Sequence, residues 1–162
     1  MNQSLIKRLV YLTSLTVILT FTFQSTQAQA KANKDSLILE NTISEFLISF
    51  NNLDTTKFDT FFDESVIVFF PPSVKYPYKV TGKTEVLRKF HSLFSNIRST
   101  NAGPPFLKLD PQKKDVRLEG HIAIVTFELK DPTLLGRRTL IFKRIGQKWK
   151  IIHLHASGNT YQ

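Results

Sequence analysis

The amino-acid sequence predicts an α+β domain, a cone-shaped half-barrel in which three N-terminal helices pack in a curved, mostly antiparallel sheet. Two observations lead to this fold class. Apolar residues recur at helical spacing in the first half of the chain, and after residue 105 they change to extended runs of β-branched and aromatic residues. Helices gathered on one face of an antiparallel sheet are the α+β arrangement, and a sheet curved around them leaves one end open.

The first thirty residues carry the parts of a secretory signal peptide. Lys7 and Arg8 form a basic start, residues 9–23 are an uncharged apolar run, and A-Q-A at residues 28–30 is typical of a cleavage site. The run is short compared with the roughly 20 residues that cross a bilayer, so we expect cleavage rather than anchoring. The mature protein is therefore expected to be exported, to the periplasm or to the medium.

The remaining chain has the size and composition of one domain. We expect a flexible start over residues 31–34 and a single domain over residues 35–158. The chain has no cysteine, which excludes disulfides, a thiol nucleophile and a zinc–thiolate site. Of its 14 phenylalanines, all but Phe21 and Phe23 lie after residue 30, and these must supply much of the core. The net charge of the full chain is +9, or +7 without Lys7 and Arg8, and it comes from scattered lysines and arginines, a pattern that does not indicate nucleic-acid recognition.

Three helices are predicted before the main run of strands. The first spans residues 35–52, where one face is apolar, and Asp54 is a good N-cap for a short second helix rich in phenylalanine. The third helix opens near Thr81 and ends at residues 101–105. A buried strand, VIVFF at residues 66–70, separates the second helix from the third.

Extended segments fill the rest of the chain. The first covers residues 106–109 and 115–118 with an interruption between them, and the second covers residues 121–129. Residues 138–144 and 149–156 form a closing hairpin around a tight turn. Connected in this order, the segments predict a meander of antiparallel strands.

The closing hairpin decides which side chains face the interior. A regular register from the tight turn pairs Leu140 with His153 and Arg138 with His155, and directly opposed residues share a face of the sheet. We therefore expect a pocket floor that is apolar near the turn and polar at Arg138, His153 and His155. A carboxylate would bind favourably at this polar end. A slip of one residue would invert these faces.

Glu128 and Tyr78 are further candidates for the pocket. Glu128 would neutralise Arg138 if the preceding hairpin pairs the two, and Leu129 is the rival neighbour of Arg138. Tyr76 and Tyr78 lie in a loop that would close over the cone, with ordinary loop packing as the alternative interpretation.

Several segments resemble the SnoaL-like domains of the nuclear transport factor 2-like superfamily. The resemblance is carried by NNLDTTKFDTFFDESVIVFFPP at residues 51–72, GKTEVL at 82–87, GHIAIVTFEL at 120–129 and GRRTLIFKRIGQKWKIIHLHAS at 136–157. It covers nearly all of residues 35–157. The C-terminal strands are also similar to the association domain of calcium/calmodulin-dependent protein kinase.

The resemblance implies the cone-shaped fold and a dimer packed through the outer face of the sheet. Ile141, Ile152 and Leu154, on the face predicted to lie away from the pocket, fit such an interface. Members of the superfamily cyclise, isomerise or dehydrate their substrates, or bind and assemble without catalysis, so fold alone does not choose a function. Pocket arginines of the kinase association domain fall on Leu140 and Ala156 here, so that anion pocket is not carried over.

The two histidines of the motif H-L-H admit three interpretations. Two imidazoles on one strand face can ligate zinc, with a third ligand from His91, Glu128 or Asp59. They can instead be hydrogen-bonded members of the sheet, or they can contact a ligand. We expect no metal, because nothing in the sequence spacing demands a third ligand. We also expect no cofactor, since the sequence contains no phosphate loop and no dinucleotide motif.

These observations favour an exported, dimeric domain that binds a small, partly apolar molecule without turning it over. The alternative is an isomerase, cyclase or dehydratase in which His153 or His155 acts as acid–base beside Arg138. Other candidate bases are Asp59, Asp63 and Glu128. A third hypothesis is an assembly module with a vestigial pocket. The expected partners are a second copy and a small molecule, with no nucleic acid and no membrane after the signal peptide is removed.

Overall fold

The computed structural model describes residues 33–71, 78–130 and 134–160. The chain divides into two units, residues 1–38 and 39–162. In the first unit the described residues, 33–38, are helical. The second unit carries the sheet and the pocket. None of the helices in the described ranges is long and apolar enough to span a membrane. The predicted signal peptide lies outside the described residues.

The second unit begins with helices and ends with long strands. Residues 39–51 are helical. They are followed by α2 (Thr55–Phe58), the 3-10 helix η1 (Asp59–Phe61), β1 (Phe62–Phe69), β2 (Lys79–Thr81), α3 (Lys83–Thr100), β3 (Pro111–Glu119), β4 (Ile122–Lys130), β5 (Leu134–Ile145) and β6 (Lys148–Thr160). Asp54 caps α2 as predicted, because its Oδ1 accepts a hydrogen bond from the backbone N–H of Lys57 at 3.0 Å.

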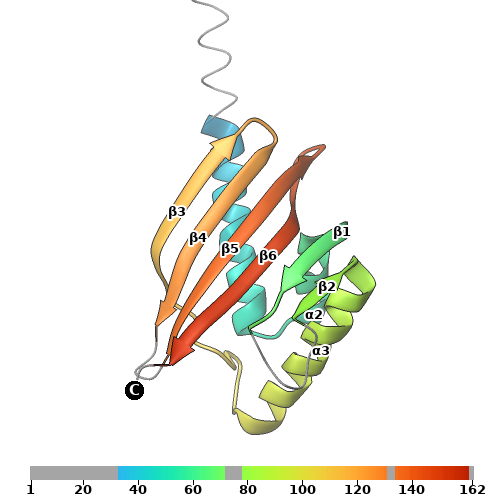
Figure 1. Cartoon of the computed structure of the whole chain (residues 1–162), viewed down its shortest axis with the longest axis vertical. Helices are drawn as coiled ribbons and strands as arrows, with labels where there is room; N and C mark the ends of the chain where they lie inside the picture. Colours follow the sequence, from blue (N-terminus) through green and yellow to red (C-terminus); the bar gives the residue numbers. More distant parts are fainter. Residues whose placement is uncertain (1–32, 72–77, 131–133, 161–162) are drawn as a thin grey trace, which may run out of the picture. The chain divides into compact units, whose positions relative to one another are not determined.

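The strands form one six-stranded sheet in the order β2-β1-β6-β5-β4-β3. Every neighbouring pair is antiparallel except β1 and β6, which run parallel. Figure 1 shows a curved, unclosed sheet with the helix of residues 39–51 crossing behind it and α3 near the edge made by β1 and β2. The predicted α+β half-barrel with a mostly antiparallel sheet is therefore confirmed.

Two details of the strands differ from the sequence prediction. Residues 106–109 form no strand, because their backbone is held by Asn51, whose carbonyl accepts from Phe106 N at 2.9 Å and whose Oδ1 accepts from Leu109 N at 2.9 Å. The short strand β2 was not predicted, since three residues carry too little alternation to be recognised.

The core between helices and sheet is built from phenylalanines. Phe58, which is fully buried, stands at its centre. Its ring centroid lies between 4.9 and 5.5 Å from those of Phe46, Phe50, Phe62, Phe90 and Phe94. Most of these pairs are edge-to-face, the arrangement that aromatic quadrupoles favour. This cluster holds the helices on the inner face of the sheet in a chain without disulfides.

The register of β5 and β6 departs from the predicted one near the middle of the hairpin. Phe142 pairs with Ile151, as a regular register requires, but the next pair along β5 is Ile141 with His153. Ile152 is therefore an extra residue in β6, which makes it a β-bulge. The neighbouring strand β1 also shifts register against this part of β6, so the two strands adjust together.

Beyond the bulge the predicted faces of β6 are inverted. His153 and His155 lie on the outer face, while Leu154 and Ala156 are buried on the inner face. The predicted pairs of Leu140 with His153 and of Arg138 with His155 are wrong. The physical reason is that one inserted residue moves every later side chain of the strand to the opposite face, and here it keeps apolar residues inside.

Candidate ligand pocket

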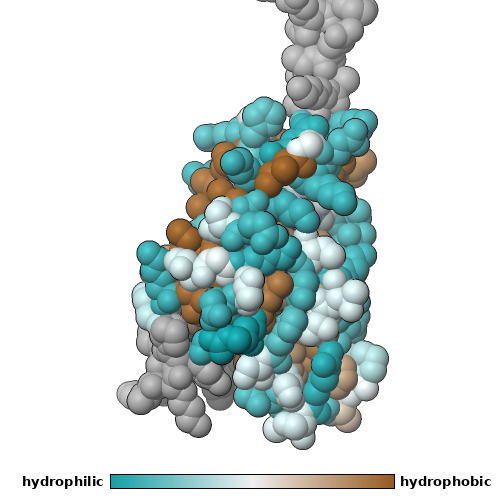
Figure 2. All heavy atoms as spheres, turned by 90° about the vertical axis from the view of Figure 1, so that its right-hand side faces the viewer, coloured by the Kyte–Doolittle hydropathy of each residue, from teal (hydrophilic) through white to brown (hydrophobic). Residues whose placement is uncertain are grey.

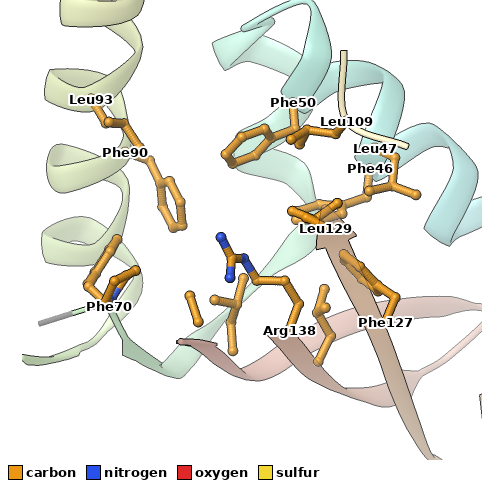
Figure 3. A pocket seen from close by; sticks show the side chains of 14 residues that line it. Phe46, Leu47, Phe50, Phe70, Phe90, Leu93, Leu109, Phe127, Leu129 and Arg138 are labelled. Atoms are coloured by element: carbon orange, nitrogen blue, oxygen red, sulfur yellow. The ribbon is translucent and has the colours of Figure 1, made fainter. Parts of the chain in front are cut away.

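A cavity of about 160 Å³ lies between the helix of residues 39–51, α3 and the inner face of β4, β5 and β6 (Figure 3). Thirteen of its fourteen lining residues are apolar, and the exception is Arg138. Protein interiors are otherwise close-packed, so a void of this size is an unusual feature of a small domain. A cavity of about 150 Å³ is large enough to hold benzene.

The walls of the cavity come from the helices and its floor comes from the sheet. Phe50 and Phe90 extend from the two helices, and Phe70 follows the end of β1. Leu140 on β5 and Leu154 on β6 form part of the floor, because they are cross-strand partners on the inner face. The alternation of β5 from the buried Phe142 puts Leu140 and Arg138 on this same face, so Arg138 lines the pocket as the sequence predicted.

The guanidinium of Arg138 points into the pocket between the aromatic rings (Figure 3). Its Nη1 donates to the carbonyl oxygen of Arg137 at 2.8 Å and to that of Ser157 at 2.9 Å. These two bonds use both hydrogens of Nη1. The Nε and Nη2 atoms have no hydrogen-bond partner among the described residues. Burial lowers the pKa of Arg138, but an arginine remains protonated in proteins, so the pocket holds a positive charge.

Glu128 does not neutralise this charge. It pairs with Arg137 across the β4–β5 ladder and lies on the outer face, where its Oε2 is 2.9 Å from Nζ of Lys113. The residue opposite Arg138 on β4 is Phe127, so neither Glu128 nor Leu129 is its neighbour. Both predicted pairings are wrong, because the loop between β4 and β5 sets a register that alternation alone does not determine.

Gly136 provides the space that the guanidinium occupies. A Cβ atom built on Gly136 would lie 3.1 Å from Nη1 and 3.4 Å from Nη2 of Arg138. Any other residue at this position would press on the guanidinium. No sequence pattern indicates this role of Gly136, because it depends on where the arginine side chain folds back.

The histidines and Tyr78 gather around Phe69 on the outer face of the sheet. The ring centroid of Phe69 lies 5.6 Å from that of His153, 6.0 Å from that of His155 and 5.5 Å from that of Tyr78. Burial lowers the pKa of His153, and the neighbouring His155 lowers it further. None of these side chains lines the cavity, so the prediction that they form part of the pocket is wrong. Tyr76 lies outside the described residues.

The family model of SnoaL-like domains matches this chain over residues 39–161, which is nearly the whole second unit. The chain belongs to the SnoaL-like domain family. No curated protein matches it significantly in sequence. The family and the nuclear transport factor 2-like fold suggested by the sequence motifs are both confirmed.

Solved structures share the fold of this SnoaL-like domain at low sequence identity. A proposed dehydratase of the nuclear transport factor 2-like family from Streptomyces avermitilis is 18% identical, with a TM-score of 0.64 over 78% of this chain and 96% of that one. A CaMKII hub from S. rosetta is 22% identical, with a TM-score of 0.57 over 75% and 95%. A proposed ketosteroid isomerase from Parabacteroides distasonis is 25% identical, with a TM-score of 0.54 over 71% and 83%.

One polar pair of the SnoaL-like domain lies apart from the cavity lining and was not recognised as a pair in the sequence. Nε2 of His91 on α3 lies 2.7 Å from Oδ1 of Asp59 on η1, and both side chains are partly exposed. The zinc site suggested by the H-L-H motif would need His153 and His155 on β6 to meet a third ligand from another segment. Within the described ranges, no group of three histidine, aspartate or glutamate side chains is arranged to hold a metal ion.

Proposed function

We propose that this SnoaL-like domain binds a small, partly apolar ligand in the cavity between its helices and sheet and does not turn it over. The observation that carries the proposal is the cavity itself, with its apolar walls and a single charged group, Arg138. Small-molecule sites commonly combine an apolar lining with a few polar groups that fix orientation.

The placement of the histidines supports binding over acid–base catalysis. A general base has to reach the reacting proton at about 2.6–3.2 Å, directly or through one water. His153 and His155 are on the face of the sheet opposite to Arg138, so the three do not share a site. The described lining residues include no carboxylate, imidazole or hydroxyl group. These lining residues therefore include no acid–base group of the kind that the activities named for the dehydratase and isomerase neighbours would require.

Native mass spectrometry of the protein after incubation with a metabolite extract tests ligand binding. We expect a small-molecule adduct on the unmodified protein and none on Ala156→Leu, because Ala156 lies on the cavity floor and a larger side chain would fill the space. Ile48→Ala, an exposed change on the first helix, is the matched control and should keep the adduct. An adduct that survives Ala156→Leu would contradict the proposed location, and a protein that stays empty would count against binding.

A second proposal concerns the outer face of the sheet, which we propose packs against a second copy of the chain. Ile124, Ile141 and Ile67 lie on this face in one row that runs across β4, β5, β6 and β1. Figure 2 shows a mainly hydrophilic surface on which hydrophobic residues gather toward the side that faces the viewer in Figure 1. An apolar centre within a polar rim is typical of a two-fold interface. Leu154, which the sequence assigned to this interface, faces the pocket instead.

The third proposal is that the domain works after export. Its support is the charged start, apolar run and cleavage signal of residues 1–30, which lie outside the described residues. Expression of the full chain in a bacterial host, followed by N-terminal sequencing of the product outside the cytoplasm, tests it. The expected first residue is Lys31, and a cytoplasmic product that keeps residues 1–30 would contradict the proposal.

A further inference from the structure

We infer that the ligand of this pocket is a small monocarboxylate, whose carboxylate group is held by the Nε–Nη2 edge of Arg138. The inference rests on the proposed binding function and adds the chemical class of the ligand. It is carried by three features of the pocket: the free edge of the guanidinium, the missing countercharge and the size of the cavity.

The free edge of the guanidinium fits a carboxylate. Because Nη1 donates to the backbone carbonyls of Arg137 and Ser157, the plane of the Arg138 guanidinium is fixed by the sheet itself. The remaining donors, Nε–H and one Nη2–H, are parallel and lie on one edge. Two parallel N–H groups match the two oxygens of one carboxylate in a bidentate pair, a geometry that lysine does not offer.

The charge of Arg138 has no partner inside the cavity. Arg138 forms no ion pair with any described residue, and the nearby Glu128 is engaged by Lys113 on the opposite face. Burying an ionised group without a partner is costly, and burial already disfavours its charged form. A bound anion compensates the charge, a neutral ligand leaves it uncompensated, and a cationic ligand is repelled.

The cavity limits the apolar part of the ligand. Drug-sized ligands occupy pockets of roughly 300–1,000 Å³. The volume of about 160 Å³ here accommodates one ring or a short acyl chain beside the carboxylate. A fused polycyclic molecule would not be enclosed. The rings of Phe50, Phe70 and Phe90 offer flat apolar walls for such a group.

Titration calorimetry with isosteric probes tests the charge requirement. Benzoate is compared with benzamide, and hexanoate with hexanamide, because each pair differs in charge and hardly in shape. We expect each carboxylate to bind the unmodified protein at least tenfold more tightly than its amide, a difference of about 1.4 kcal/mol or more. Phenyl phosphate is a third arm, and it should bind more weakly than benzoate; tighter binding would overturn the carboxylate in favour of a phosphate.

Variants of two adjacent arginines locate the effect. Arg138→Gln should remove the preference for carboxylate over amide, while Arg137→Gln, which removes the same charge on the outer face, should keep it. Arg138→Lys keeps the charge without the fork and should weaken benzoate at least fivefold. It also provides the test if Arg138→Gln fails to fold. A preference that persists in both Arg138 variants would overturn the inference.

The outcomes separate this inference from the proposed binding function. If acid and amide bind the unmodified protein equally and Ala156→Leu abolishes both, the pocket binds ligands but the carboxylate inference is wrong. If no probe binds at concentrations up to about 20 mM, which corresponds to a binding free energy weaker than about −2.3 kcal/mol, the inference and the proposed function both fail.

Discussion

Ile141 on β5 pairs with His153 on β6, one residue out of step with the adjacent pair of Phe142 and Ile151. The bulge at Ile152 lets β6 keep apolar side chains on the inner face on both sides of it. It also turns the imidazoles to the outer face and leaves Arg138 as the charged side chain of the described pocket. The predictions below depend on this separation of the two faces.

Deleting Ile152 should cost the protein most of its stability. The deletion restores a regular register and turns His153 and His155 inward in place of Leu154 and Ala156. Burying imidazoles without partners and exposing apolar groups should lower the free energy of unfolding by about 3 kcal/mol or more. Urea denaturation followed by circular dichroism measures the loss. The substitution Ile152→Ala, which keeps the bulge, is the control, and equal stability of deletion and substitution would contradict the register.

His153 should make stability depend on pH. Burial and His155 lower the pKa of His153 below its ordinary value of 6.5, so the unfolded chain binds more protons as the pH falls below that value. The contribution of neutral His153 is therefore fully present above 6.5 and is lost as the pH falls from 6.5 through the lower folded-state pKa. As the pH falls from about 7 to about 5, the free energy of unfolding should decline less steeply for His153→Gln than for the control His121→Gln. Equal slopes in the two variants would be the contrary result.

Gly136→Ala should weaken carboxylate binding through the position of Arg138. The added Cβ would lie 3.1 Å from Nη1, closer than neighbouring groups normally approach, so the guanidinium has to shift. We expect benzoate to bind about three- to tenfold more weakly, while the affinity for benzamide changes little. Ser157→Ala is the control, because Arg138 donates its hydrogen bond to the backbone carbonyl of Ser157, which the substitution keeps. If calorimetry finds the same affinity for benzoate in the unmodified protein and in Gly136→Ala, Gly136 has no such role.

Phe58→Ala should be among the most destabilising single substitutions in the core. Phe58 is fully buried and contacts five other phenylalanine rings, so its truncation leaves a large cavity. The free energy of unfolding should fall by about 3–5 kcal/mol. The exposed Ile145→Ala should change it by about 0.5 kcal/mol or less. Urea denaturation of both variants checks the difference, and similar values for the two would contradict the packing described for Phe58.

Ile141→Glu should prevent dimerisation. Ile141 lies near the middle of the outer sheet face, where a buried carboxylate from each copy would face the partner without compensation. Sedimentation equilibrium of residues 31–162 should give the mass of a dimer for the unmodified protein and that of a monomer for the variant. Ile48→Glu, an exposed change on the first helix, should remain dimeric. An unmodified protein that is monomeric at all concentrations would remove the proposed interface.

The sequence was sufficient to predict the fold but only part of the site. Helical and extended periodicity located the three helices and the long strands. The hairpin register assigned Arg138 the wrong partner on β6 but the right face, because β5 itself alternates regularly from Phe142 to Arg138. The side chains of β6 were misassigned because their faces depend on a bulge between two consecutive isoleucines, Ile151 and Ile152. Two apolar neighbours in a strand carry no local signal that one of them is unpaired.

The remaining site features depend on distances that no sequence pattern encodes. Glu128 was assigned to the wrong neighbour because the loop before β5 left its register open. The contact of His91 with Asp59 joins a helix to a 3-10 turn across 32 positions of sequence. Gly136 matters because the guanidinium of Arg138 folds back along its own strand, a contact that residue spacing does not predict.

The most direct test of the separation between the two sheet faces is a nuclear magnetic resonance titration of labelled protein, residues 31–162, with benzoate. We expect the Nε–H signal of Arg138 and the methyl signals of Leu140 and Leu154 to shift to saturation, while the imidazole signals of His153 and His155 stay in place. Shifts confined to the two imidazoles, with Arg138 and the leucine methyls unchanged, would contradict it.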